Sequence, residues 1–172
     1  MNVIYVDEKD REIGSGSIAD ALEKGIIVRI ARVFLFNSNG ELLIQKRSDT
    51  HKSFPGRWDQ TAAGHVDADE TYLNAATREL EEEMGIRGAL LKEAAKFYTE
   101  ERDKRKTIRR FNMLFTGVYD GEVRIDTHEV SDFRWVMLSE LKKEMKESPQ
   151  RFAEGFIKTV SVYEKAQEIG NT

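Results

Sequence analysis

Three glutamates close together in the middle of the chain are the residues best suited to chemistry. Glu79, Glu82 and Glu83 stand three and four positions apart. On a helix with about 100° per residue they would lie within about 100° of one another, where their like charges repel. A hard divalent cation would compensate for the repulsion, because Mg²⁺ takes oxygen ligands and binds through one or two carboxylates together with substrate phosphates. The spacing therefore indicates a metal site.

A run of glutamates on its own is more typical of a solvated helix face. Two neighbouring features favour a site instead. Arg78 directly precedes the cluster and could fix one carboxylate through a bidentate pair. The cluster also ends a longer pattern, GHVDADETYLNAATRELEEEMGI, that runs from Gly64 to Ile86. Glu81 falls outside the shared flank and is not part of the predicted site.

The glutamates need a helix to bring them together, and the sequence predicts one over residues 72–84. Apolar residues recur there every three or four positions, as on the buried stripe of an amphipathic helix. They are Leu73, Ala76, Leu80 and Met84. Gly85 ends the helix as a C-cap glycine does. The candidate N-caps are Asp67, Asp69 and Thr71, of which Thr71 suits the start best.

The segment before this helix, KRSDTHKSFPGRWDQTAAGH, carries the candidate phosphate ligands. Its basic residues are Lys46, Arg47, His51, Lys52 and Arg57. A loop of this kind could hold a diphosphate while the helix holds the metal, because guanidinium and ammonium groups bind phosphate oxygens. The substrate-binding candidates are Arg47, Lys52, Arg57 and, in an earlier strand, Arg29. A plain solvated loop is the alternative.

Three ring-bearing side chains lie in the same region. His51 and His65 could each take part in catalysis, although a lone histidine more often has a structural role. Trp58 fits a packing anchor better than a ligand contact. We therefore assign none of the three to the site.

Elsewhere the chain alternates between strand and helix signals. Apolar runs rich in β-branched and aromatic residues predict strands over 3–6, 26–36, 42–45, 89–98, 111–119 and 133–137. Helices are expected over 18–24, 138–145 and 151–168. The charged segment TEERDKRKTIRR, residues 99–110, is interpreted as a hairpin loop.

The length of 172 residues, with 40% hydrophobic and 34% charged content, is enough for one well-packed soluble domain. We expect a single domain over residues 1–172, with an N-terminal β-hairpin and a short helix in 1–25 and the core in 26–172. The hairpin, over residues 3–14, is exposed enough to serve a homodimer.

Composition excludes several classes of function. A net charge of −4 argues against a dedicated binder of nucleic acid polymers, whose binding surface would be basic. The absence of cysteine excludes disulfides, thiolate metal sites and cysteine nucleophiles. No apolar run approaches the roughly 18 residues needed to span a membrane, and the N-terminus lacks a basic segment followed by an apolar one. We therefore expect a cytoplasmic protein without membrane contact.

The pattern from Gly64 to Ile86 resembles the box of the Nudix hydrolase superfamily. The resemblance implies an α/β fold, an α/β/α sandwich with a mixed β-sheet between helices. It also implies cleavage of a small-molecule diphosphate by water with Mg²⁺ or Mn²⁺. Carried over by position, Glu82 and Glu83 look like metal ligands, and Glu79 looks like a ligand that can also act as the base.

Three further roles follow from the resemblance. Arg78 would orient Glu79, and the carbonyl of Gly64 would add a metal contact. A further ligand often comes from the loop before the last strand, where Glu129 stands six residues before Trp135. The rivals for that role are Glu100 and Glu101.

Within the superfamily, LLIQKRSDTHKSFPGRWDQTAAGHV and VDEKDREIG look like the branch that includes type I isopentenyl-diphosphate isomerases. Those isomerases need a cysteine before the box glycine, where Ala63 stands, and a second acid in a strand that here carries Thr107 to Arg110 without glutamate. We therefore predict a Mg²⁺-dependent pyrophosphohydrolase acting on a nucleoside diphosphate or its derivative. The alternatives are an isoprenoid-diphosphate enzyme and a non-catalytic nucleotide-sensing module.

Overall fold

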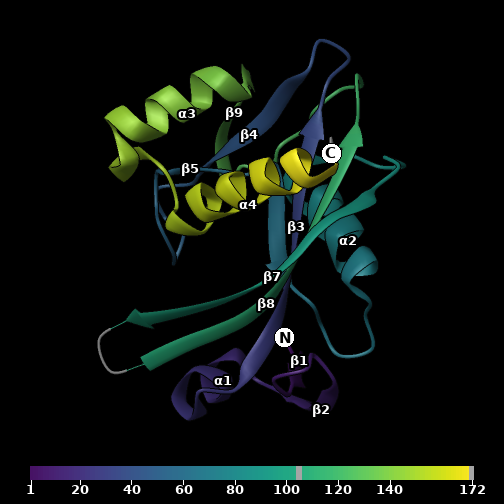
Figure 1. Cartoon of the computed structure of the whole chain (residues 1–172), viewed down its shortest axis with the longest axis vertical. Coiled ribbons are helices and arrows are strands. Elements are labelled where there is room, and N and C mark those ends of the chain that lie inside the picture. The colour runs from purple at the N-terminus through teal and green to yellow at the C-terminus, as the bar shows by residue number, and fades with distance from the viewer. Residues whose placement is uncertain (104–105, 171–172) are drawn as a thin grey trace.

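The computed structural model describes residues 1–103 and 106–170, and in it a mixed β-sheet lies between helices (Figure 1). The strands are β1 (Val3–Val6), β2 (Glu12–Gly16), β3 (Ile27–Phe36), β4 (Glu41–Arg47), β5 (Trp58–Asp59), β6 (Ala62–His65), β7 (Lys92–Asp103), β8 (Lys106–Val118) and β9 (Val130–Met137). The helices are α1 (Ile18–Lys24), α2 (Tyr72–Met84), α3 (Leu138–Glu147), the 3₁₀ turn η1 (Pro149–Arg151) and α4 (Glu154–Gly170).

The predicted α/β/α sandwich with an N-terminal β-hairpin is confirmed. Helix α2 packs on one face of the sheet, over a core that includes Val33, Leu80 and Met84. Helices α3 and α4 pack on the other face, over a core that includes Phe34 and Phe156. Strands β1 and β2 pair as the hairpin, and β1 adds it to the edge of β3. No helix in the described ranges is both long and apolar enough to cross a membrane.

Strand β3 is the centre of the sheet. It pairs in parallel with β8 along residues 27–36 and antiparallel with β1, β4 and β6. Its one pairing with β4 in the described part of the chain joins Phe36 to Leu42. Beyond that point the two strands diverge, and β4 continues with β5 and β9. The sheet therefore forks between β3 and β4.

Thr61 closes this fork. Its Oγ1 accepts a hydrogen bond from the backbone N–H of Leu35 at 2.9 Å and donates one to the carbonyl of Leu43 at 2.6 Å. The residue is completely buried. One hydroxyl thus satisfies two backbone groups that the diverging strands would otherwise leave unpaired, which fixes where the next strand, β6, begins.

The helix that carries the glutamates has the predicted bounds and caps. The Asn74 N–H donates to Thr71 Oγ1 at 3.1 Å, and Gly85 adopts the left-handed conformation of a C-cap. The predicted apolar stripe is wrong at Leu73, which is 44% exposed, while Ala75 is buried. At about 100° per residue, this exchange rotates the buried face toward Glu79, which is itself buried.

The prediction of a loop over residues 99–110 is wrong, because β7 and β8 continue as one long hairpin. The hairpin reaches past α1 in Figure 1. Opposite charges across the strands compensate for its polar composition. Glu100 lies opposite Arg109 with 3.5 Å between Oε2 and Nε, and Glu101 Oε2 lies 3.6 Å from Arg110 Nη1. Such cross-strand pairs stabilise a sheet. The tip at positions 104–105 lies outside the described residues.

The fork yields a stability prediction. Thr61→Val keeps the shape of the side chain but leaves the Leu35 N–H and the Leu43 carbonyl unsatisfied, so we expect the free energy of unfolding to fall by at least about 2 kcal/mol. Thr61→Ser keeps the hydroxyl and should cost only about 1 kcal/mol for the lost methyl group. Urea denaturation of both variants measures this difference. A valine variant at least as stable as the serine variant would contradict the role of the hydroxyl.

Candidate active site

Glu79 lies directly against β6, because residue 64 has no side chain. A Cβ atom built on Gly64 would lie 1.9 Å from Glu79 Oε1. The carboxylate is fixed by its neighbour in sequence, since Arg78 Nη1 donates to Glu79 Oε1 at 2.6 Å. The sequence prediction that Arg78 orients Glu79 agrees with this contact.

Arg78 is itself held from several sides. Its Nε and Nη2 donate to the two carboxylate oxygens of Glu70 at 2.8 and 3.0 Å, and Nη2 also donates to the carbonyl of His65 at 3.0 Å. Nη1 reaches Glu82 Oε2 at 3.3 Å. Sequence reasoning gave Glu70 no role, although it lies inside the 64–86 pattern, eight residues before Arg78.

Glu83 lies one helical turn after Glu79 and is held by a strand on the other arm of the fork. Gln45 Nε2 donates to Glu83 Oε2 at 2.6 Å and to the carbonyl of Thr61 at 3.1 Å. Gln45 is buried and was not predicted as a site residue. The available signal was its position as a polar residue directly after the apolar run Leu42–Ile44.

Burial makes both carboxylates hard to ionise. It raises the pKa of Glu79 to about 7, against the opposing effect of Arg78. It raises the pKa of Glu83 well above the usual range, and the charge of Glu79 raises it further. Glu82, in contrast, has a side chain that is 59% exposed. Two neighbouring buried carboxyl groups therefore lack sufficient positive charge nearby.

These donors fit a hard divalent cation. Carboxylate and carbonyl oxygens are the ligands that Mg²⁺ and Mn²⁺ prefer, and a cation would compensate the charge that burial disfavours. The carboxylates that the structure brings together are those of Glu79 and Glu83, with Gly64 directly beside Glu79. Among the described residues, no three acidic or histidine side chains converge tightly enough to enclose an ion. Mg²⁺ does not need such a cage, because it keeps several waters.

Glu129 and Arg47 meet at His51. Glu129 Oε2 lies 3.2 Å from His51 Nε2, and Arg47 Nη2 lies 2.8 Å from the His51 ring nitrogens. Arg47 also donates to the buried Asp59 at 2.7 Å, and its positive charge acts on Glu83 to lower the pKa. The structure therefore places Arg47 near the buried glutamates and places Glu129 in the neighbouring loop.

The other predicted ligands are more scattered. Arg29 donates to Asp10 at 2.7 Å and to Glu12 at 3.0 Å, so its guanidinium is occupied by the N-terminal hairpin. Lys52 is exposed, and Arg57 stacks over Phe54. The rivals to Glu129 as the additional ligand lie on the β7–β8 hairpin. They are Glu100 and Glu101, which pair with Arg109 and Arg110 respectively.

Two aromatic side chains near the site have different surroundings. Trp58 is buried in the α4-side core and packs under the guanidinium of Arg134, so its role as a packing anchor is confirmed. His65 is partly buried, and its pKa is lowered to about 4 by burial and by the charges of Arg110 and Arg32. Its imidazole is therefore neutral at pH 7.

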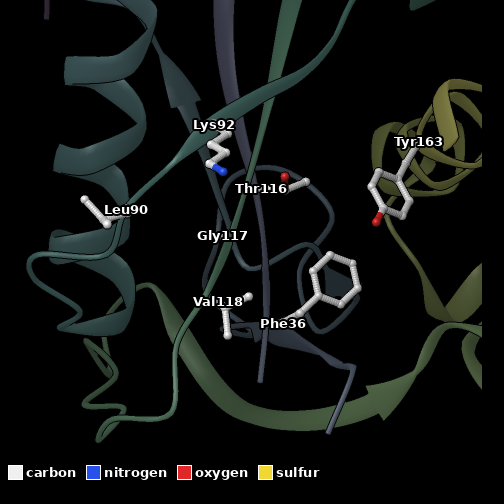
Figure 2. A pocket seen from close by; sticks show the side chains of 7 residues that line it. All are labelled: Phe36, Leu90, Lys92, Thr116, Gly117, Val118 and Tyr163. Atoms are coloured by element: carbon white, nitrogen blue, oxygen red, sulfur yellow. The ribbon is translucent and has the colours of Figure 1, made fainter. Parts of the chain in front are cut away.

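A separate pocket of about 370 Å³ lies at the far ends of β3 and β8 (Figure 2). It is lined by Phe36, Leu90, Lys92, Thr116, Gly117, Val118 and Tyr163. None of these residues belongs to the carboxylate cluster or to the basic loop. The pocket is therefore not part of the candidate active site.

Comparison with known families gives a match that spans the segment around Glu79. The model of the NUDIX domain matches residues 27–156, which includes β6, α2 and the basic loop. The chain belongs to the Nudix hydrolase family. An uncharacterised Nudix hydrolase of Pseudomonas aeruginosa is 40% identical over 134 residues, covering 78% of this chain and 77% of that protein.

Two other similarities concern this Nudix hydrolase. An isopentenyl-diphosphate Delta-isomerase of Photorhabdus laumondii is 33% identical over 159 residues, covering 92% of this chain and 90% of the isomerase. A crystal structure from Deinococcus radiodurans has the same fold, with a TM-score of 0.78, 22% identity and coverage of 94% of this chain and 98% of that one. The sequence interpretation as a Nudix hydrolase of the isomerase-like branch is thus confirmed at the level of family.

The contact between Gly64 and Glu79 can be tested directly. Gly64→Ala would force the carboxylate away from β6, so we expect turnover of a diphosphate substrate to fall by at least about tenfold, as for a displaced catalytic group. Gly170→Ala is the control, because a Cβ there meets nothing within 4 Å. Steady-state kinetics on both purified variants checks this, with circular dichroism to confirm folding. A folded Gly64→Ala protein with normal turnover would show that the contact is not needed.

Proposed function

We propose that this Nudix hydrolase is a Mg²⁺-dependent pyrophosphohydrolase that cleaves a diphosphate linkage in a nucleoside diphosphate or its derivative by attack of water. The observation that carries the proposal is a pair of buried carboxyl groups on the inner flank of α2, Glu79 against β6 and Glu83 held by Gln45 of β4. Buried carboxylates of this kind are a suitable seat for a divalent ion that also contacts substrate phosphates.

The residues have distinct roles in this proposal. Glu79, Glu82, Glu83 and the carbonyl of Gly64 would hold the ion. When bound, Mg²⁺ or Mn²⁺ lowers the pKa of water and neutralises phosphate charge. Glu79 accepts the proton from the attacking water, as a carboxylate fixed within hydrogen-bond reach of the water can do. Arg78 keeps the accepting carboxylate in place.

The basic loop would hold the diphosphate. Arg47 is the best placed of its cations, because its charge already acts on Glu83. Lys52 and Arg57 follow on the same loop and could close over the phosphates. Glu129 contacts His51, which in turn contacts Arg47. Glu129 is the proposed additional metal ligand. We leave Arg29 out of the binding site, because Asp10 and Glu12 occupy its guanidinium.

Isomerisation of an isoprenoid diphosphate is the second candidate, and similarity to an isomerase along 90% of its length favours it. Against it, the position before Gly64 holds Ala63, which cannot supply the thiol that the isomerases use. A non-catalytic sensing module is the third candidate. It would bind nucleotides without releasing product.

A substrate panel decides among these candidates. The purified protein is incubated with nucleoside diphosphates, sugar-linked nucleoside diphosphates and isopentenyl diphosphate, with Mg²⁺ or Mn²⁺, and products are identified by mass. We expect phosphate or nucleoside monophosphate from at least one nucleotide compound, and no isomerised product. Isomerisation of isopentenyl diphosphate, or binding of nucleotides without any product, would overturn the proposal.

Substitution of single glutamates tests the assigned roles. Glu79→Gln should reduce turnover by at least about 10²-fold, the lower range for loss of a general base. Glu83→Gln should weaken activation by Mg²⁺, seen as a higher metal concentration for half-maximal rate. Glu81→Gln is the matched control, because Glu81 lies on the same helix but pairs only with Arg87 among the residues described. Near-normal turnover in Glu79→Gln would refute its assignment.

Metal binding should also stabilise the fold in a pH-dependent way. The folded-state pKa values of Glu79 and Glu83 are raised, so in the metal-free protein stability is lost as the pH rises from about 4.5, the usual value for glutamate, through about 7. Mg²⁺ binds the ionised carboxylates and should restore this loss. We therefore expect added MgCl₂ to raise the melting temperature more at pH 8 than at pH 5.5. Equal shifts at both pH values would contradict a site built from these groups.

A further inference from the structure

A second polar group lies on the sheet face opposite Glu79. Ile30 on β3 is the register partner of both His65 on β6 and Asn112 on β8, so these three side chains point to the same face. Arg32 lies two residues after Ile30, and Arg110 lies two residues before Asn112, so both arginines share that face.

This face lies between the two helices that cover its ends. At one end Val28, the register partner of Arg110, packs against Ala21 of α1. At the other end, both terminal nitrogens of Arg32 would lie 3.2 Å from a Cβ on Gly155, near the start of α4. Figure 1 shows α4 crossing the sheet and α1 near the lower end of β3. The two arginines therefore lie in the interval between α1 and α4.

The arginines have few acceptors. Arg32 is only 6% exposed, and its one hydrogen bond in the described residues runs from Nε to Asn112 Oδ1 at 2.9 Å. The Nε atom of Arg110 is buried without a hydrogen-bond partner. Among the described residues, the acid paired with Arg110 is Glu101, whose Oε2 lies 3.6 Å from Arg110 Nη1, beyond hydrogen-bond distance. Buried guanidinium donors without acceptors are costly, and an oxyanion would satisfy them.

The local charge is also positive. Asp59 is the other acid near Arg32, but it is engaged by Arg47 at 2.7 Å. Among the described residues, Glu101 is therefore the acid left to balance Arg32 and Arg110. Anions with several oxygens, such as a phosphate, match both the charge and the fork of donors that arginine presents.

Strand β6 connects this face to the candidate active site. Gly64 faces Glu79, and the next residue, His65, faces the arginines. In the described structure β6 pairs with β3 alone, so no strand covers its outer edge. A substrate that crosses this edge could contact both faces.

We propose that Arg32 and Arg110, beside His65, form an oxyanion subsite that takes a phosphate of the substrate beyond the diphosphate being cleaved. This inference rests on the proposed function and narrows it. The preferred substrates are diphosphates that carry a further anionic group on the second moiety. Isopentenyl diphosphate, which has none, gains nothing from the subsite.

The test uses binding of inorganic phosphate to the metal-free protein, followed by isothermal titration calorimetry. Arg110→Gln should weaken binding by at least about tenfold, because it removes hydrogen bonds from a charged donor to the phosphate. Arg109→Gln is the matched control. Arg109 is the residue directly before Arg110 on β8, lies on the opposite face of the sheet and pairs with Glu100 and Tyr98. It should bind phosphate within about twofold of wild type.

Kinetics supplies a second readout. For a substrate with a further phosphate, Arg110→Gln should raise KM by about tenfold and change kcat by less than about threefold, as for loss of uniform binding. Arg110→Lys keeps the charge without the fork of donors and should weaken phosphate binding by about threefold or more. This variant carries the test if Arg110→Gln does not fold.

Three results would overturn the subsite: a wild-type protein that does not bind phosphate, a folded Arg110→Gln variant that binds as wild type does, or equal losses in the Arg109 and Arg110 variants. Failure of the proposed function is distinguishable. In that case wild type cleaves no diphosphate, while phosphate binding is still lost in Arg110→Gln and kept in Glu79→Gln.

Discussion

The site depends on holding two ionisable carboxyl groups out of water on the inner side of one helix. A buried carboxylate is costly unless charges or hydrogen bonds compensate for its lost hydration. Glu79 has the guanidinium of Arg78, and Glu83 has the amide of Gln45, yet burial raises the pKa of both. The missing positive charge is the physical basis for proposing a divalent cation here.

That burial requires an opening in the sheet. Strands β3 and β4 separate after a single pairing, and the hydroxyl of Thr61 satisfies the backbone groups left at the fork. Gln45 then reaches from β4 to the Thr61 carbonyl and to Glu83, while Gly64 leaves room for Glu79. The short segment from Thr61 to Gly64 thus completes the sheet and shapes the site.

The two faces of the sheet at β6 carry different kinds of residues. The face toward α2 carries the Gly64 and Glu79 contact, which belongs to the pattern that defines the family. The opposite face of β6 carries Ala63 and His65, beside Arg32 of β3 and Arg110 of β8. Because side chains alternate along a strand, residues on the second face can change without disturbing the first.

Local features of the box helix were determined by the sequence alone. Its bounds and its Thr71 and Gly85 caps follow from interactions within a few residues, and the structure has them as predicted. The neighbouring Arg78 contact is local in the same way. The family resemblance was carried by the same 23-residue pattern of local sequence. It is confirmed, because the NUDIX domain model matches residues 27–156.

Contacts between distant segments were decided only by the tertiary structure. Leu73 is exposed because the rest of the fold sets which face of the helix is buried. Residues 99–110 extend the strands because pairing across the hairpin outweighs their charged composition. Arg29 is occupied by Asp10, and Gln45 finds Glu83 across 38 positions. Such pairings depend on strand register and on where the sheet forks, and no pattern of neighbouring residues encodes either one.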